Sequence, residues 1–337
     1  MSLVCSGYLL ENNSGNRLTV EHTNDMIKLR IGIVGFGHLG QYLYSMLESH
    51  PQFEIAFVWN RSKNVLIDRH VAPSLILDKL ENIFELEVDL IVEVAHPSIT
   101  KKYGQLFLEH GAYFIGSPTA LADQETYDLL QKATNTQNRA VYVPSGALWG
   151  GEDIRRMALQ GTLKGLTITM AKHPSSFKLT DSEGDITTIT EPKVVHEGSV
   201  RQLCPLAPNN VNTMAAAAVA ASNLGFDMVY GRIIADPSLL DWHVIEVEVT
   251  GPSQADGRTF TTKTIRKNPA DPGAVTGTAT FGSFFSSLLN AARRHGYHPE
   301  TGFILLYDAT KSSFVGLRSI FDIFLKNFCC MFVFLYH

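Results

Sequence analysis

The chain has little concentrated positive charge. Its 337 residues contain 28 Lys and Arg against 33 Asp and Glu, which gives a net charge of −5, and no stretch is strongly basic. Because nucleic-acid binding depends on a dense positive face, this composition disfavours a nucleic-acid partner. Disorder is also disfavoured, since 45% of the residues are hydrophobic and only 18% are charged. The length and composition predict two domains of ordinary size.

Cysteine and long apolar runs are scarce as well. The four cysteines form no C-x-x-C pair, which favours free thiols in a reducing compartment. No run reaches the ~18 apolar residues that a spanning helix needs, and residues 2–10 lack the basic segment of a signal peptide. No zinc-binding spacing and no Ser-His-Asp order occurs. The sequence therefore predicts a cytoplasmic protein that has no membrane partner and needs no metal.

Short apolar segments alternate with helical patterns between residues 28 and 145. Strands are expected at 29–34, 54–59, 89–94, 112–115 and 140–143, with helices between most of them. Alternation at these lengths favours a parallel sheet that helices cover on both faces. We expect a doubly wound Rossmann domain at 28–145, preceded by an N-terminal extension at 1–27.

The pattern changes after about residue 145. Longer and more strictly alternating strands are expected at 166–170, 229–235, 243–250 and 258–267, and an Ala-rich helix at about 212–223. These elements predict a second α/β domain at 146–273 with a mixed or antiparallel sheet that carries the substrate. A last helix, within 274–297, is expected to return to the Rossmann domain. Residues 298–337 form an atypical tail to which no function is assigned.

A glycine-rich turn follows the first expected strand and opens an amphipathic helix. It consists of Gly35, Phe36, Gly37, His38, Leu39 and Gly40. In this context the G-x-G-x-x-G pattern predicts dinucleotide binding. The first glycine permits the tight turn, the second lets the backbone approach a pyrophosphate, and the third lets the helix pack closely on the strands. The phosphates would lie at the N-terminus of the helix, where free N–H groups favour negative charge.

The acidic residue that selects NAD is absent from the end of the second expected strand, where Asn60 and Arg61 stand instead. Asn60 can bond a ribose hydroxyl without repelling a phosphate, and Arg61 can pair with a 2′-phosphate. We therefore expect NADP to be accepted alongside NAD, although Arg61 can also be an ordinary surface charge.

At the end of the next expected strand, Ala95 and His96 are expected to line the nicotinamide side of the coenzyme. The alternative for His96 is that it caps the following helix.

His243 is the candidate for catalysis. Alternation along its expected strand puts it on the inner face with Ile245 and Val247, and Asp241 on the same side is a candidate to orient the imidazole. A histidine in such a position can exchange protons near neutral pH. The alternative is a core histidine that bonds a backbone carbonyl.

Further polar candidates surround the expected domain junction. Asn210 and Asn212 stand at the start of the Ala-rich helix, where they either cap the helix or hold a substrate or cofactor oxygen. Ala147 leaves room for the nicotinamide. Lys172 is either a cationic partner for a dicarboxylate substrate or a surface lysine.

Over about residues 28–295, the chain resembles the L-aspartate dehydrogenase family, and most closely its animal members. The resemblance rests on GFGHLG (35–40), VEVAHPSI (92–99), GALWGGEDIRR (146–156), NNVNTMAAAAVAA (209–221), ADPSLLDWHVIEVEVTGP (235–252) and NPADPGAVTGTA (268–279). The glycines and aromatics of GALWGG replace the loop that is usual in microbial members.

The resemblance implies a Rossmann domain with an α/β substrate domain, usually paired as a homodimer. It also implies oxidation of L-aspartate with NAD or NADP to iminoaspartate, which water converts to oxaloacetate and ammonia. His243 matches the family's catalytic histidine, and Ala147 and Asn212 match its cofactor-contacting alanine and asparagine. Two alternatives remain open at this stage: a dehydrogenase of another small amino or hydroxy acid, and a catalytically idle NADP-binding sensor or docking protein.

Overall fold

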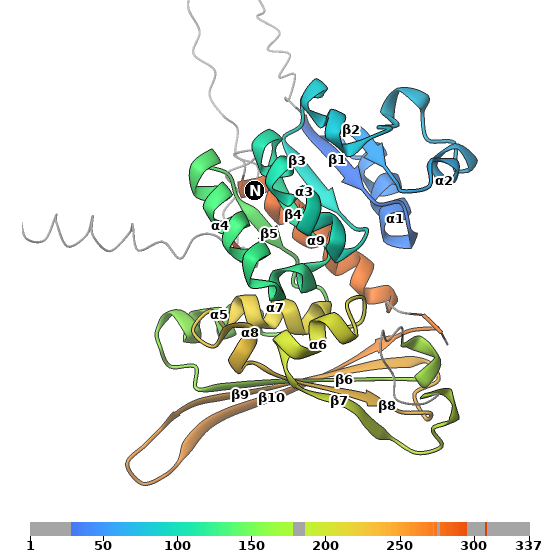
Figure 1. Cartoon of the computed structure of the whole chain (residues 1–337). Helices are drawn as coiled ribbons and strands as arrows, with labels where there is room; N and C mark the ends of the chain where they lie inside the picture. Colours follow the sequence, from blue (N-terminus) through green and yellow to red (C-terminus); the bar gives the residue numbers. More distant parts are fainter. Residues whose placement is uncertain (1–27, 178–185, 272, 275–276, 295–306, 309–337) are drawn as a thin grey trace, which may run out of the picture.

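The computed structural model describes residues 28–177, 186–271, 273–274, 277–294 and 307–308, which form two α/β units packed against each other (Figure 1). The expected fold class is confirmed: one unit holds a Rossmann-type parallel sheet, and the other holds a mixed sheet. The expected N-terminal extension at 1–27 and nearly all of the expected tail at 298–337 lie outside the described residues.

The first sheet has the strand order β11-β5-β4-β3-β1-β2. Its five parallel strands are β1 (Leu29–Val34), β2 (Phe53–Trp59), β3 (Leu90–Glu93), β4 (Ala112–Ile115) and β5 (Val141–Val143), and β11 (Tyr307–Asp308) pairs antiparallel with β5. Every residue of β3, β4 and β5 is buried. Such complete burial explains why these strands are apolar at every position except Glu93, because helices cover both faces of the sheet.

The helices of this unit are α1 (His38–Glu48), α2 (Lys63–Asp68), α3 (Pro97–His110) and α4 (Gln124–Gln137), with 3₁₀ turns η1 (Pro73–Leu75), η2 (Leu80–Glu85) and η3 (Pro118–Ala122). The last helix, α9 (Thr278–Arg294), crosses behind the sheet (Figure 1). Its aromatic rings pack on this unit: Phe284 lies 5.1 Å from Phe114, and Phe281 lies 5.5 Å from Tyr42, between ring centroids.

The second sheet has the order β10-β9-β6-β8-β7. Its strands are β6 (Gly165–Lys172), β7 (Lys193–Ser199), β8 (Tyr230–Ala235), β9 (Trp242–Ser253) and β10 (Thr259–Pro269), and only the β6–β8 pair is parallel. Two further 3₁₀ turns, η4 (Pro174–Ser176) and η5 (Ile186–Thr188), follow β6.

Four helices lie between this sheet and the Rossmann unit (Figure 1). They are α5 (Gly151–Leu159), α6 (Val200–Leu206), α7 (Asn212–Ala220) and α8 (Gly225–Met228). The Ala-rich α7 is buried on almost every side because it is enclosed by both units. Alanine suits this place, since its small side chain lets neighbouring elements approach closely without polar atoms to satisfy.

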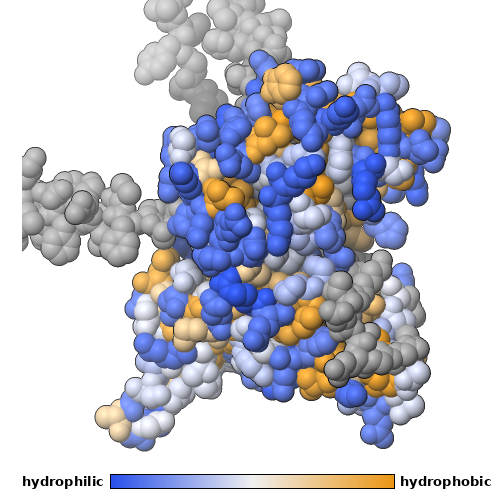
Figure 2. Space-filling model, viewed as in Figure 1, coloured by the Kyte–Doolittle hydropathy of each residue, from blue (hydrophilic) through white to orange (hydrophobic). Residues whose placement is uncertain are grey.

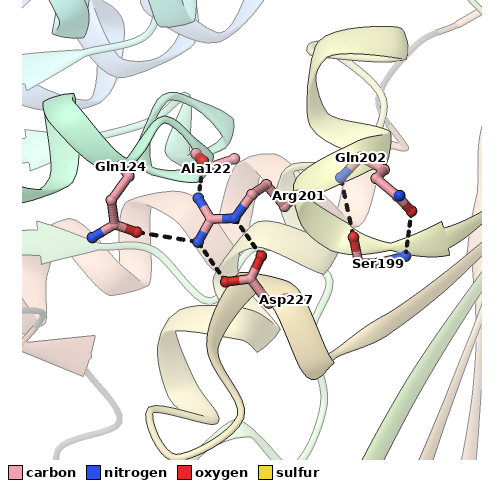
Figure 3. A network of polar contacts seen from close by, with 6 residues as sticks. All are labelled: Ala122, Gln124, Ser199, Arg201, Gln202 and Asp227. Atoms are coloured by element: carbon pink, nitrogen blue, oxygen red, sulfur yellow. Dashed lines mark hydrogen bonds and ion pairs between the residues drawn. The ribbon is translucent and has the colours of Figure 1, made fainter.

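Arg201 of α6 joins the two units (Figure 3). Its guanidinium donates to Asp227 at 2.5 and 2.9 Å, to Gln124 at 3.2 Å and to the carbonyl of Ala122. Nearby, the hydroxyl of Thr119 donates to the carbonyl of Pro208 at 3.0 Å. These bonds hold η3 and α4 of the Rossmann unit against α6 and α8 along one seam.

The surface in the same view is mostly hydrophilic over the Rossmann unit, and hydrophobic residues form small separate patches (Figure 2). Within the described ranges, no helix combines the length and apolar character needed to cross a membrane.

Candidate active site

A pocket of about 110 Å³ lies between the two units. Leu39, Gly116 and Pro118 line it from the Rossmann unit, while Lys172 and His243 line it from the second sheet. From the Rossmann unit they come from the first turn of α1 and from the segment after the carboxyl end of β4, and from the second sheet they come from the end of β6 and the start of β9. Ligands of open α/β sheets collect at the carboxyl ends of the strands.

The glycine turn has the geometry that dinucleotide binding requires. Gly35 has a positive φ of 109°, and a Cβ there would meet the backbone nitrogen of Ala95 at 2.8 Å. A Cβ at Gly40 would meet the carbonyl oxygen of Gly35 at 2.2 Å, so α1 can pack this closely only with glycine. A Cβ at Gly37 would meet nothing within 4 Å. The turn is therefore closed toward the protein and open at Gly37, where a diphosphate could approach.

Asn60 fastens this turn. Its Oδ1 accepts a hydrogen bond from the backbone nitrogen of Phe36 at 3.1 Å, and its Nδ2 donates to the carbonyl of Ser62 at 3.0 Å. The side-chain amide is thus engaged by the protein itself, and a ribose hydroxyl would have to share Oδ1. Arg61 follows at the end of β2 and is exposed.

Ala95 and His96 are exposed and are not among the residues that line the pocket. The side chain of His96 caps α3, because its Nδ1 accepts from the backbone nitrogen of Ser98 at 3.2 Å. His38, in the first turn of α1, is exposed as well. His38 and His96 therefore lie outside the pocket, as does Ala95, whose backbone nitrogen lies beside Gly35 of the glycine turn.

Glu93 is a functional candidate that the sequence patterns did not single out. Its carboxyl group is fully buried at the end of β3. It accepts from the backbone nitrogens of Ala95 at 2.7 Å and Ser117 at 3.0 Å, and from the hydroxyl of Ser117 at 3.1 Å. Burial raises its pKa to about 7 against the opposing effect of these bonds. One carboxyl group therefore joins the loops that follow β3 and β4.

His243 is the second residue of β9 and is buried, with a relative exposure of 5%. Burial lowers the pKa of its imidazole to about 4, the charge of Lys172 adds to this effect, and a backbone hydrogen bond with Ala274 opposes it. Its Nε2 is buried without a hydrogen-bond partner among the described residues. Asp241 is exposed, so the expectation that it orients the imidazole is wrong, and Ala274 takes that place.

Lys172 ends β6 and is buried, with a relative exposure of 4%, so it is not a surface lysine. Burial lowers the pKa of its amine to about 8. Leu166, Ile168 and Met170 precede it at every second position and are buried too. The alternation of this strand therefore continues to Lys172 and directs it to the inner face of the sheet.

The two asparagines at the start of α7 differ in their contacts. Asn210 is buried, and its Nδ2 donates to the carbonyl of Ser176 at 3.2 Å. Asn212 is the first residue of α7, and its buried Oδ1 has no partner among the described residues. The N-cap of α7 is Val211, so neither asparagine caps the helix through its side chain. Both asparagines and the buried Ala147 line the pocket.

Asn268 also lines the pocket and was missed from the sequence. It pairs with His243 across β9 and β10, and it is buried, with a relative exposure of 2%. The lining contains no aspartate or glutamate within the part of the chain that the structure describes. In those same residues no cluster of His, Cys, Asp and Glu could hold a metal ion. The pocket is therefore suited to an anionic ligand.

Comparisons with known proteins find relatives for both units of the chain. A family model for the C-terminal part of aspartate dehydrogenase matches residues 153–287, and one for the NAD-binding domain of homoserine dehydrogenase matches residues 35–144. An aspartate dehydrogenase domain-containing protein of Xenopus tropicalis is 51% identical over 278 residues, which cover 80% of this chain and 96% of the relative. The L-aspartate dehydrogenase of Nitrosopumilus maritimus is 26% identical over 231 residues, which cover 66% and 83%.

A crystal structure of aspartate dehydrogenase from Thermotoga maritima has the same fold. It aligns with a TM-score of 0.60 at 23% identity, covering 81% of this chain and 99% of that one. The glycine turn opens an NAD-binding domain, and the relative from Xenopus matches at a level that shows common membership. The chain therefore belongs to the aspartate dehydrogenase family.

Proposed function

We propose that the protein oxidises L-aspartate to iminoaspartate with NAD or NADP, that water then releases oxaloacetate and ammonia, and that it catalyses the reverse reaction as well. The observation that carries the proposal is the unpaired Nε2 of His243, buried in a pocket that also holds Lys172 and Leu39 of the first turn of α1. The family and its L-aspartate dehydrogenase members support the choice of substrate.

The residues present fit a nicotinamide dinucleotide. The open space over Gly37 and the N-terminus of α1 suit its pyrophosphate. The unpaired Oδ1 of Asn212 is an acceptor for the amide of its nicotinamide ring, and Ala147 leaves room beside that ring. When bound, the coenzyme supplies a hydride acceptor for the Cα–H of the substrate. Exposed Arg61 favours the 2′-phosphate of NADP, and no acidic residue follows β2 to oppose it.

The cationic and amide groups of the pocket suit a small dicarboxylate. Below pH 8 the amine of Lys172 is charged and can pair with a substrate carboxylate. Asn210 donates its Nδ2 to the carbonyl of Ser176, which fixes its side chain in the lining that also contains Lys172. Burial of this charged amine costs free energy, and a bound carboxylate reduces that cost.

His243 handles protons in this scheme. With a pKa of about 4, its imidazole is neutral at pH 7, so Nε2 can accept a proton from the water that attacks the imine. A pKa this low makes a weak base. A bound dicarboxylate would neutralise the repulsion from Lys172 and raise the pKa of His243, which brings the base closer to the working pH when substrate is present.

The family resemblance further suggests a homodimer. The sheet face that points away from the helices carries Ile234, Val244 and Ile265, and Ile265 is 57% exposed. Partial exposure of aliphatic side chains on one face supports an association between two copies. Sedimentation or light scattering at several protein concentrations would decide whether the protein is dimeric.

The decisive experiment is an assay with purified protein. NADP and NAD reduction is measured with L-aspartate, and NADPH oxidation with oxaloacetate plus ammonia, beside a panel of other amino and hydroxy acids. Aspartate-dependent turnover supports the proposal, and turnover only with another acid reassigns the substrate. Coenzyme binding without any turnover would contradict the proposal and favour an idle NADP-binding protein.

A further inference from the structure

Asn268 is a buried amide in the lining of the pocket that has no part in the function proposed above. It lies in β10 directly opposite His243 of β9, and both side chains are buried and line the pocket. A buried amide costs free energy unless its donor and acceptor atoms are both satisfied. Among the described residues, the hydrogen bonds of the Asn268 side chain satisfy only one of these atoms.

The satisfied atom is the oxygen. The guanidinium Nε of Arg266 donates to Oδ1 of Asn268 at 2.7 Å. An arginine side chain has donors and no acceptor, so only the amide oxygen can face it, and the orientation of the amide is thereby defined. The donor Nδ2 is left over, and it makes no hydrogen bond with the described residues. Gly277 packs against the Cβ of Asn268, where an added Cβ would lie only 3.2 Å away.

Arg266 is itself held in place. Its Nη1 lies 3.4 Å from the carbonyl oxygen of Gly146, which also accepts from the hydroxyl of Ser283 at 2.7 Å. Burial lowers the pKa of Arg266, and no carboxylate among the described residues pairs with it. The guanidinium therefore adds positive charge behind Asn268, on the oxygen side of its amide.

These contacts define what the pocket can accept beside His243. A fixed amide donor, a cation behind it and Lys172 in the same lining all favour a negatively charged oxygen atom. We propose, resting on the function proposed above, that Asn268 determines specificity by donating Nδ2 to a carboxylate of the substrate, and that Arg266 is a positioning residue that fixes this amide. The carboxylate is thereby held next to the imidazole.

The test uses Asn268→Asp, which keeps the shape of the side chain but replaces the donor by an acidic oxygen. Because a hydrogen bond to a charged group contributes about 1.5–3 kcal/mol, we expect the KM for L-aspartate to rise about 10- to 100-fold. The affinity for NADPH should stay within about twofold, since the loss concerns substrate binding. Asn223→Asp is the matched control, because the Nδ2 of Asn223 bonds the carbonyl of Leu163 outside the pocket.

Arg266→Lys tests the positioning role and serves if Asn268→Asp does not fold. A lysine cannot donate to the amide of Asn268 in the same geometry, so the amide can rotate and turn its oxygen, in place of Nδ2, toward the substrate. We expect a rise in the KM for L-aspartate that is smaller than in Asn268→Asp, with little change in kcat. Thermal unfolding of each variant shows whether it is folded.

Binding separates this inference from the proposed function. Succinate and, for comparison, propionate are titrated calorimetrically into the wild-type and variant complexes with NADPH. Weaker succinate binding in Asn268→Asp and Arg266→Lys supports the inference even if L-aspartate is not turned over. Equal succinate affinity and an equal KM in the wild type and both folded variants would overturn it. Failure of the wild-type complex to prefer succinate over propionate would overturn it too.

Discussion

Lys172 acts electrostatically on His243: its positive charge adds to burial in lowering the pKa of the imidazole to about 4. Both residues line one pocket, one from the end of β6 and the other from the start of β9. An anion bound in such a site has two effects, because it stabilises the charged lysine and makes the histidine more basic. Substrate binding and proton transfer are therefore coupled.

Replacing His243 tests the catalytic assignment. His243→Ala should lower kcat by about 10²- to 10⁴-fold, the usual contribution of a positioned acid or base. NADPH affinity, measured by fluorescence titration, should be nearly unchanged, because the coenzyme contacts proposed above come from other residues. His243→Asn, which keeps a polar side chain of similar reach, should be as impaired. Normal turnover in either variant would remove His243 from the mechanism.

The pH dependence of anion binding tests Lys172. Succinate is a dianion throughout neutral and alkaline solution, so its affinity reports on the protein. We expect its Kd to rise as pH increases through about 8, where Lys172 loses its proton. Lys172→Met should bind succinate weakly at every pH and lose this dependence. If succinate affinity still fell with pH in Lys172→Met, the pH dependence would belong to another group.

Lys172 also makes a prediction for stability. Its folded pKa of about 8 lies below the ordinary value of 10.5, so between these values the folded state binds fewer protons than the unfolded state. The free energy of unfolding of the ligand-free wild type should therefore increase with pH across this window, relative to Lys172→Met. Urea denaturation at pH 7.5 and 9.5 measures the difference, and a constant difference would contradict the expected cost of burying the charge.

Glu93 should stabilise the loops after β3 and β4. Glu93→Ala leaves the backbone nitrogens of Ala95 and Ser117 without their acceptor, which should cost about 2 kcal/mol or more of unfolding free energy. The carboxyl pKa of about 7 exceeds its ordinary 4.5, so the folded state binds more protons between these values. The wild type should lose stability relative to Glu93→Gln as pH rises from 4.5 to 7. Denaturation at several pH values checks both expectations.

Two glycines of the same turn should respond differently to alanine. In Gly40→Ala the new Cβ would lie 2.2 Å from the carbonyl oxygen of Gly35, so the turn must shift and the Tm should fall by several degrees, since overpacking costs about 1–3 kcal/mol. Gly37→Ala meets no atom within 4 Å and should keep its Tm. Its NADPH affinity should nevertheless fall, because the methyl group occupies the space proposed for the pyrophosphate. Equal NADPH affinity in Gly37→Ala and the wild type would show that the pyrophosphate does not lie over Gly37.

Arg61 should influence the choice of coenzyme. Arg61→Ala should raise the KM for NADPH about tenfold and leave that for NADH nearly constant, because only NADPH carries the 2′-phosphate. Arg69→Ala is the matched control, since Arg69 is also exposed and ends the next helix. If the KM for NADH rose as much as the KM for NADPH, Arg61 would have a structural role and would not select the coenzyme.

Local features of the chain were predictable from its sequence. The glycine turn and the buried strands of the Rossmann unit depend on short-range patterns, and their predicted bounds agree with the structure within about two residues for β1 to β5. Strand β7 was missed because it lies at the edge of the sheet, where none of its residues is buried and the pattern lacks a clear alternation. Helix α6 was missed because it is short and contains Pro205.

The composition of the site was harder to predict, because it depends on which distant residues become neighbours. Glu93 stands within the apolar run of β3, where nothing in the pattern separates a buried carboxyl from a surface one. Asn268 becomes a candidate only once the β9–β10 register brings it opposite His243. Lys172 did carry a signal, since the alternation of Leu166, Ile168 and Met170 extends to it.

The seam held by Arg201 has a consequence for the exchange of small molecules. To separate the two units, the protein would have to break the bonds of Arg201 with Ala122 and Gln124 and that of Thr119 with Pro208 together. We therefore expect coenzyme and product to leave through local rearrangements around the pocket, with the units remaining docked. Release rates should then respond to substitutions near the opening and stay insensitive to solvent viscosity, which retards large rotations.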